Sequence, residues 1–348
     1  MDFSFKDMFR NHVEQVSNGK NTVIYDKFGN PNIMYVLRKF NNRLLTANVT
    51  DTAYPFIIGD KEVNEIFISK YHNGIGEGGV PISYPAMFPA HCKYRELNDL
   101  VKKKGSGWKF FSAVEFRTLI LLGQLCESTP VGKYVGDEPL DGVAGCGPNG
   151  YKERYRKPGT HNPKYNHDGT QFGVTGLMQD RWIFTPGAII APDGQFWATG
   201  KEKDHYTNDP TWFGSRENMT PTGIYFNTAT GVSTTPYTGG DYSSTVRFTK
   251  DTFPKPSITR SISILLGFLP IPQFYEDNNV SIRCRVGYGV DHFCTCGGTE
   301  WDHEYIANDN SHLNTYFSPA YCEDDDAYLN AGGHAFRTTY IPELDTGW

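Results

Sequence analysis

The chain has 348 residues, of which 38% are hydrophobic, 21% charged and 14% aromatic, and its formal net charge at pH 7 is −6. This length allows one large domain or two ordinary ones, and the negative charge gives no electrostatic case for nucleic-acid binding, which needs a basic face. No apolar run reaches the roughly 18 residues of a transmembrane helix, and residues 1–20 lack the apolar core of a secretory signal. We therefore expect no nucleic-acid binding, no membrane insertion and no signal peptide.

The first third of the chain predicts strands followed by two helices. Residues 21–40 predict two strands around a turn, and residues 62–71 predict another strand. From residue 91 the apolar spacing is helical and stops at Gly105, a residue that commonly follows a helix. Ser112 and Glu115 form a capping box, in which each side chain bonds the backbone amide of the other residue, so a buried helix of about a dozen residues should follow.

The middle of the chain is rich in Gly, Pro, Tyr and Thr, and it predicts long ordered loops at residues 127–170 and 203–256. Between these loops a hairpin is predicted from Trp182, with its turn at residues 192–194. Two core strands are expected later, at residues 260–270 and 280–289.

The order of these pieces resembles a known family. Its signals are GSGWKFFSAVE (residues 105–115), NHDGTQFGVTGLMQDRWIF (166–184), a Gly297-Gly298 turn with Trp301, and Ala335-Phe336-Arg337. In this order they resemble the C-type-lectin-like fold of the formylglycine-generating-enzyme group, over roughly residues 20–344. Within the group the chain is most similar to phage tail receptor-binding proteins and to variable proteins diversified by retroelements.

The resemblance implies an α+β fold with small sheets, two short helices and long ordered loops. It implies a C-type-lectin-like ligand-binding domain over residues 51–348, with the variable face at 297–340. Residues 1–50 are expected to be a strand-rich segment that attaches the chain to other tail proteins or to sister subunits. Related adhesins are trimeric, which predicts a homotrimer.

The same group contains a copper-dependent oxidase, which is the enzymatic alternative. That activity needs two cysteines a few residues apart after the Gly-Gly turn, where this chain has only Cys322. Cys294 and Cys296 precede the turn, and one sulfur cannot build a two-thiolate copper site. The chain has seven cysteines, an odd number, and free thiols are expected. We therefore expect no enzyme and no catalytic residue.

The segment near the C-terminus has an unusual composition. Residues 286–336 contain nine acids and no Lys or Arg, although Lys and Arg number 33 in the whole chain. In residues 302–330, 17 of 29 residues are Asp, Asn, Tyr, His or Ser. Tyr offers a large contact area at low entropic cost, and Asn and Ser offer adaptable hydrogen bonds, as in antibody paratopes. The composition predicts a recognition surface for a cationic or neutral ligand, or for one bridged by a metal ion.

Retroelement mutagenesis of adenines in Asn codons would generate the same composition. Such codons readily become Tyr, Asp, His or Ser but not Lys, Gln, Met or Trp, and residues 302–330 contain none of those four. Glu304 and Glu323 would then be fixed positions. A low-GC genome, which enriches Asn and Tyr throughout, is the alternative explanation. The predicted ligand-binding residues are Asp302, His303, Tyr305, Asn308, Asp309, Asn310, His312, Asn314, Tyr316 and Tyr321.

Two further groups of residues receive expected roles. Asp324, Asp325 and Asp326 form either a solvated acidic loop or a calcium site, and no other cofactor is expected. Trp108, Trp182 and Trp301 should lie in the core, and Arg337 should anchor the last strand through a buried carboxylate or carbonyl contact.

These expectations describe a phage tail receptor-binding protein, an adhesin that is carried in the virion and recognises a protein or glycan on the bacterial surface. The alternatives are a ligand-binding module of a cellular surface or signalling protein and, last, the oxidase.

Overall fold

The computed structural model describes residues 4–45, 51–58, 61–85, 87, 89–90, 94–126, 142–146, 152–155, 159, 162–163, 166–177, 182–198, 219–227, 231–240, 242–248, 280–286, 292–297, 313–319 and 336–344. Within these residues the fold is mixed, with small, mainly antiparallel sheets and few helices, so the predicted α+β class is confirmed at that level. The helices are α1 (Phe5–Val16), α2 (Tyr94–Lys103) and α3 (Ala113–Leu125), and the 3-10 turns are η1 (Asn42–Leu44), η2 (Tyr54–Phe56), η3 (Glu77–Gly79) and η8 (Pro342–Leu344).

The first sheet, called the frame sheet, has the order β1-β2-β5-β19-β8, and every neighbouring pair in it is antiparallel. The strands predicted at residues 21–40 and 62–71 are confirmed, and the last strand of the described chain, β19, lies between β5 and β8. The bounds of these strands are β1 (Asn21–Tyr25), β2 (Pro31–Arg38), β5 (Glu65–Ser69), β8 (Trp108–Phe110) and β19 (Thr338–Tyr340).

The second sheet, called the outer sheet, has the order β14-β13-β12-β11-β17-β18-β16-β15. Its neighbours are antiparallel except β16 and β18, which are parallel. Its strands are β11 (Trp182–Ile190), β12 (Gln195–Ala198), β13 (Thr220–Asn227), β14 (Gly231–Ser233), β15 (Tyr242–Phe248), β16 (Val280–Val286), β17 (His292–Gly297) and β18 (Leu313–Pro319).

The outer sheet confirms two predictions and corrects a third. The hairpin at residues 192–194 joins β11 to β12, and β16 is the strand expected at 280–289. The expectation of loop throughout residues 203–256 is wrong, because β13, β14 and β15 lie there. Thr, Tyr and Val suit a pleated sheet, and the frequent Gly and Pro had obscured this strand propensity.

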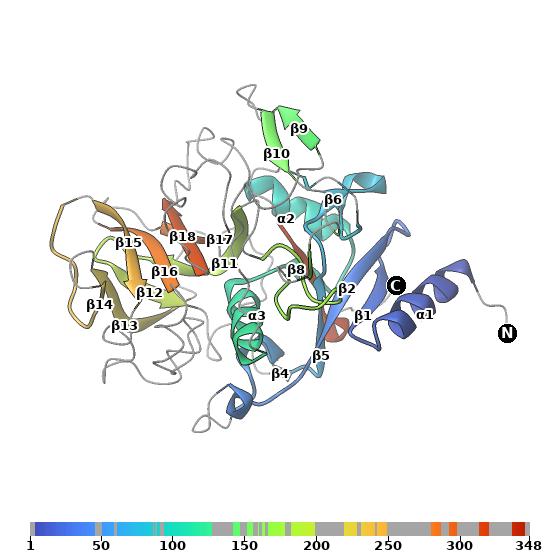
Figure 1. Cartoon of the computed structure of the whole chain (residues 1–348), viewed down its shortest axis with the longest axis horizontal. Helices are drawn as coiled ribbons and strands as arrows, with labels where there is room; N and C mark the ends of the chain where they lie inside the picture. The colour runs from blue at the N-terminus through green and yellow to red at the C-terminus, as the bar shows by residue number, and fades with distance from the viewer. Residues whose placement is uncertain are drawn as a thin grey trace.

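Helix α3 lies between the two sheets (Figure 1). The predicted capping box starts it: the Ser112 amide donates to the Glu115 carboxylate (2.6 Å), and the Glu115 amide donates to the Ser112 hydroxyl (3.4 Å). Residues 113–121 of the helix are all buried, including the polar Glu115, Arg117 and Thr118, so this part of the helix is enclosed on every face. It packs in a core cluster that takes residues from both sheets, including Ile66 and Ile68 of β5 and Phe196 and Phe226 of the outer sheet.

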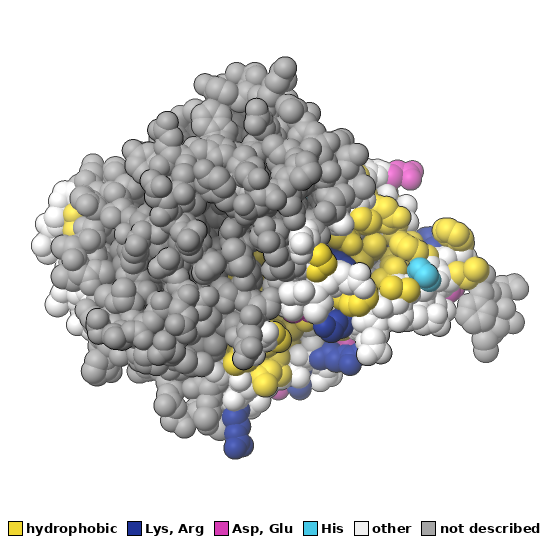
Figure 2. All heavy atoms as spheres, in the orientation of Figure 1, with side chains coloured by type: hydrophobic (Ala, Val, Ile, Leu, Met, Phe, Trp, Pro, Cys, Tyr) yellow, Lys and Arg dark blue, Asp and Glu magenta, His cyan; other side chains and the backbone are white. Residues whose placement is uncertain are grey.

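Helix α1 lies at the end of the molecule far from the outer sheet (Figure 1) and was not foreseen in the sequence. Ser4 caps it by accepting a hydrogen bond from the Asp7 amide. Its inner face packs Phe9 and Val13 on β1 and its neighbours. Phe5 and Met8 are 83% and 60% exposed, and apolar side chains gather over this end of the molecule in Figure 2.

Three two-stranded sheets complete the described structure. They pair β3 (Ile57–Ile58) with β4 (Lys61–Glu62), β6 (Gly74–Ile75) with β7 (Pro81–Ile82), and β9 (Gly142–Cys146) with β10 (Lys152–Tyr155). The last pair lies in the stretch 127–170, which was expected to be loop only. None of the helices described is long and apolar enough to cross a membrane.

Candidate functional site

Most of the predicted ligand-binding residues lie outside the described residues. These are Asp302, His303, Tyr305, Asn308, Asp309, Asn310, His312 and Tyr321, together with the calcium candidates Asp324, Asp325 and Asp326. Cys322, Trp301 and the strand expected at 260–270 also lie outside them. The roles predicted for these residues stay predictions.

Asn314 and Tyr316 are the predicted ligand-binding residues whose backbone the structure describes. Both lie on β18, which pairs with β17 on one side and with β16 on the other. Asn314 is opposite Ser281, and Tyr316 is opposite Arg283 and Thr295. The segment 302–330 is therefore not loop throughout, because hydrogen-bonded neighbours on both sides fix its central part.

Strands β8 and β19 are far apart in the sequence but are neighbours in the frame sheet. Strand β19 pairs with β8 in the register Thr338 to Phe110 and Tyr340 to Trp108. We call residues 111–337 the excursion, because the chain leaves the frame sheet after β8 and returns to it at β19. The excursion contains α3, the outer sheet and all ten predicted ligand-binding residues, whereas residues 338–340 of the predicted face form β19.

Arg337, the last residue of the excursion, anchors the chain where it re-enters the frame sheet. Its side chain is fully buried, and it donates to the carbonyl oxygens of Ser69 and Lys70, each at 3.0 Å, and to that of Thr175. The predicted carbonyl contact is confirmed, and Trp108, which is 3% exposed, lies in the core as expected. Burial lowers the pKa of Arg337 to about 9, because the charged form has lost its water.

The loop of residues 166–177 is held against the same sheet. His167 is buried, and its Nδ1 accepts a hydrogen bond from the Val174 amide at 2.8 Å. Asp168 accepts from the Thr170 amide at 3.0 Å and pairs with Lys20 at 3.3 Å. The residue after Val174 is Thr175, whose carbonyl oxygen accepts a hydrogen bond from Arg337. This loop and the buried Arg337 side chain therefore stabilise each other.

Burial sets the charge state of His167. Desolvation lowers its pKa below the ordinary value, and Lys20 and Arg337 act in the same direction. The Asp168 carboxylate opposes them without overcoming the loss of solvent. The imidazole is therefore neutral, in agreement with an Nδ1 that accepts a hydrogen bond.

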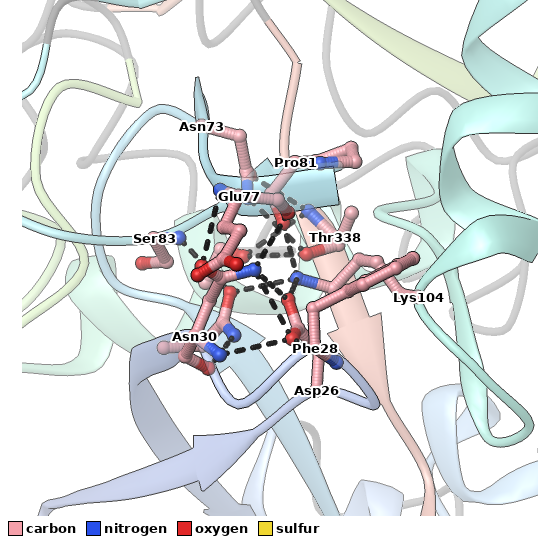
Figure 3. Close-up of polar contacts among 11 residues, drawn as sticks. Asp26, Phe28, Asn30, Asn73, Glu77, Pro81, Ser83, Lys104 and Thr338 are labelled. Atoms are coloured by element: carbon pink, nitrogen blue, oxygen red, sulfur yellow. Dashed lines mark hydrogen bonds and ion pairs between the residues drawn. The ribbon is translucent and has the colours of Figure 1, made fainter. Parts of the chain in front are cut away.

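A second buried cluster lies where α2 meets the turn between β1 and β2 (Figure 3). Lys104 is fully buried, and its ε-amino group donates to Asn32 Oδ1 at 2.7 Å and to the Pro81 carbonyl oxygen. The Asp26 carboxylate lies 3.9 Å from the same nitrogen, and the Trp108 ring centroid lies 3.8 Å from it. Burial lowers the pKa of Lys104 to about 7, and the Asp26 charge raises it only in part.

Sequence reasoning missed this cluster. Lys102, Lys103 and Lys104 are consecutive and precede Gly105, a pattern that indicates a solvated helix end. Lys102 and Lys103 are indeed exposed, whereas Lys104 is buried. The available signal was Asp26 followed by Asn30 and Asn32, polar side chains that need buried partners if the turn packs inward.

Among the described residues, no group of three or more His, Cys, Asp or Glu side chains is arranged to hold a metal ion. Calcium binding at residues 324–326 stays a prediction, since those residues lie outside the described part of the chain. The Cys294 and Cys296 backbones lie on β17, opposite Phe317 and Thr315 of β18.

No protein-family model matches the chain, and no curated protein sequence matches it. The family resemblance and the function that it implies are therefore carried forward as proposals.

Proposed function

We propose that the chain is a phage tail receptor-binding protein, which recognises a ligand on the bacterial surface through residues 297–335 of the predicted face and is carried in the virion. Residues 336–339 of the predicted face, 297–340, are buried in the structure and do not belong to the binding surface. The observation that carries the proposal is the pairing of β8 with β19 at the two ends of the excursion. A recognition segment can change its residues without loss of the fold only if contacts elsewhere hold the chain on both sides of it.

The contacts of the frame sheet meet that requirement. Phe336 and Arg337 are fully buried directly before β19, and the Arg337 side chain bonds carbonyl groups of residues 69, 70 and 175. All of these partners lie outside residues 297–335. The arrangement would also tolerate diversification by a retroelement, which is part of the proposal.

The charge of the face narrows the ligand class. Nine acids without a base in residues 286–336 repel an anionic ligand and favour a cationic or neutral one. Binding to a cationic ligand should weaken as salt is added, because exposed charges are screened within roughly 10 Å at 0.1 M ionic strength.

The N-terminal helix supports the attachment role. Phe5, Met8 and Val16 are 83%, 60% and 56% exposed and belong to one helix, at the opposite end from the outer sheet. Contact with sister subunits or with other tail proteins would cover these side chains. A homotrimer would add avidity to weak single sites.

Binding of the labelled chain to a panel of bacterial strains tests the proposal. The variant Tyr305→Ala/Tyr321→Ala removes two aromatic contacts from the face and spares Tyr316, whose backbone belongs to β18. The matched control, Phe28→Ala/Leu44→Ala, removes two exposed apolar side chains that belong neither to the face nor to helix α1.

Strain-restricted binding that the face variant loses and the control keeps would support the proposal. Equal binding by the face variant and the wild-type chain would place the site elsewhere. Binding to no strain would favour a cellular module with another partner. Circular dichroism of each variant must first match that of the wild-type chain.

A further inference from the structure

The cluster around Lys104 combines a buried amine, a buried amide and a buried carboxylic acid. Lys104 and Asn32 are both 0% exposed, and Asp26 is 3% exposed. Lys104 follows α2, Asn32 lies on β2, and Asp26 follows β1, so three separate parts of the chain converge on one point. Figure 3 shows Lys104 beside Asp26.

Lys104 is placed as a nucleophile. Its Nζ lies 2.7 Å from Asn32 Oδ1, and because a C=O bond is about 1.23 Å long, Nζ is less than about 4 Å from the amide carbon. Reacting atoms in productive complexes are roughly 3–3.5 Å apart, so a small rotation of the lysine side chain suffices. Desolvation also favours the neutral amine, which is the form that can attack.

Asn32 is placed as an electrophile. Besides the lysine, its Oδ1 accepts a hydrogen bond from the Ser83 backbone amide at 3.0 Å. This donor polarises the carbonyl group and would stabilise negative charge on the oxygen during attack. The Asn32 side-chain nitrogen donates to the Asn30 carbonyl oxygen at 3.2 Å, which fixes the plane of the amide.

Asp26 is placed as the proton carrier. Its Oδ2 lies 3.9 Å from Lys104 Nζ, within reach after the same small rotation. Its carboxylate is held by the Phe28 and Asn30 amides, each 3.0 Å from Oδ1, and by the Asn30 side chain. A buried carboxylate between an amine and an amide can take a proton from the amine and give it to the amide nitrogen.

We propose that Lys104 and Asn32 join in an intramolecular isopeptide bond. The Nζ lone pair attacks Asn32 Cγ, and the oxygen takes the negative charge while bonded to the Ser83 amide. Asp26 accepts a proton from Nζ and delivers it to Nδ2, the Cγ–Nδ2 bond breaks, and ammonia leaves. One amine and one primary amide become one secondary amide and ammonia, so the step needs no oxidant, reductant or cofactor.

A second lysine and asparagine pair in the same chain serves as an internal comparison. Lys70 Nζ donates to Asn21 Oδ1 at 3.1 Å and to the Gln171 carbonyl oxygen at 2.7 Å, in a buried setting. The nearby Asp168 is bound to Thr170 and paired with Lys20, which is largely exposed. We expect this pair to stay hydrogen-bonded and unlinked.

The bond would fasten β2 to the end of α2 and close the chain between residues 32 and 104 into a covalent loop. Like a disulfide, such a link restricts the unfolded chain. Unlike a disulfide, it does not respond to reductants. This inference does not depend on the proposed receptor-binding function.

The intact mass of the full-length denatured chain tests the proposal directly. We expect a mass lower than that of the sequence by one ammonia molecule, and a tryptic map with a branched peptide that joins residues 28–38 to residues 104–109. An unchanged mass overturns the proposal. So does an ammonia loss that maps to cyclisation at an Asn-Gly pair, such as Asn18-Gly19, without the branched peptide.

Variants assign the roles. Asp26→Asn should give the full sequence mass, because the proton carrier is lost, and Asn32→Ala should do the same. Asn21→Ala, which removes the comparison amide, should keep the loss of ammonia and the branched peptide. A linked Asp26→Asn chain would overturn the role of Asp26. If that variant fails to fold, the wild-type mass still decides whether the bond forms.

Discussion

The ring of Tyr340 lies 5.1 Å from the ring of Trp108, centroid to centroid, and the two residues are directly opposite each other on β19 and β8. This contact joins the strand that precedes the excursion to the strand that follows it. The pair belongs to a small core cluster with Met34, Phe67 and Phe336, so apolar burial as well as strand pairing holds the two ends together.

A methyl group at Gly107 should weaken this junction. Gly107 has φ +77°, and an added Cβ would lie 2.8 Å from Tyr340 Cε2 and 3.0 Å from the Ile341 carbonyl oxygen. We expect Gly107→Ala to lower the free energy of unfolding by about 2–4 kcal/mol, from overpacking and backbone strain together. Urea denaturation measures the loss.

The control for this prediction is Gly79→Ala. Gly79 has φ +68°, and an added Cβ would meet nothing within 4 Å. It should therefore cost about 1 kcal/mol, from backbone strain alone. Equal losses in the two variants would contradict the steric explanation.

Removal of the Arg337 guanidinium should lower the free energy of unfolding. Arg337→Met leaves the carbonyl groups of Ser69, Lys70 and Thr175 without this donor in a buried site. Hydrogen bonds to charged groups contribute about 1.5–3 kcal/mol each, offset here by the lost cost of burying a charge, so we expect a net loss of about 3 kcal/mol. Arg43→Met, at an exposed position, should change the unfolding midpoint little.

The Lys109 and Glu115 pair should be sensitive to loss of one partner. Lys109 Nζ lies 2.9 Å from Glu115 Oε2, and both side chains are almost completely buried. Lys109→Met leaves a buried carboxylate beside the start of α3 and should cost about 3–5 kcal/mol. Lys102→Met removes an exposed lysine nearby and should stay within about 0.5 kcal/mol of the wild-type chain.

Acid should destabilise the fold through His167. In the native state burial keeps the pKa of His167 below the ordinary value of about 6.5, so between these two values the unfolded chain binds a proton that the native chain does not. Stability is therefore lost as the pH falls below about 6.5, by up to about 1.4 kcal/mol per pH unit. Melting temperatures at pH 7 and pH 5 measure this effect.

His167→Gln should flatten that dependence, because the amide oxygen can accept the Val174 hydrogen bond and does not titrate. His12→Gln, at an exposed position of α1, should keep the slope of the wild-type chain. A wild-type slope in His167→Gln would show that another group causes the acid sensitivity.

Local signals predicted strands β1, β2 and β5 of the frame sheet and helices α2 and α3. The capping box at Ser112 and Glu115 fixed the start of α3, because both of its hydrogen bonds are local. Helix α1 was missed although Phe5, Phe9 and Val13 have helical spacing, since three of its apolar side chains are exposed and its flanks are polar. The strands of residues 220–248 were missed because turn-forming residues interrupt their short runs.

Of the two buried clusters, sequence reasoning predicted the contact of Arg337 and missed the cluster around Lys104. A lone Arg beside Phe336 predicted a buried carboxylate or carbonyl contact, because a buried guanidinium must have acceptors, and the structure shows carbonyl groups. The polar run from Asp26 to Asn32 indicated buried partners, but it could not identify Lys104 as one of them, because the cluster depends on tertiary contacts among residues 26, 32, 83 and 104. The family resemblance and the composition together predicted the ligand-binding face, and the binding experiment with the tyrosine variants tests that prediction.

The pairing of β8 with β19 also has a consequence for inheritance. The codons for Trp108 and Tyr340 encode adjacent positions in the folded chain, so two crossovers close to them would exchange everything between as a single cassette. Each new cassette would enter a chain whose first hundred residues and last strand are already fitted to each other. Homologous genes could thus exchange the whole excursion in one recombination event, a larger step than codon-by-codon change.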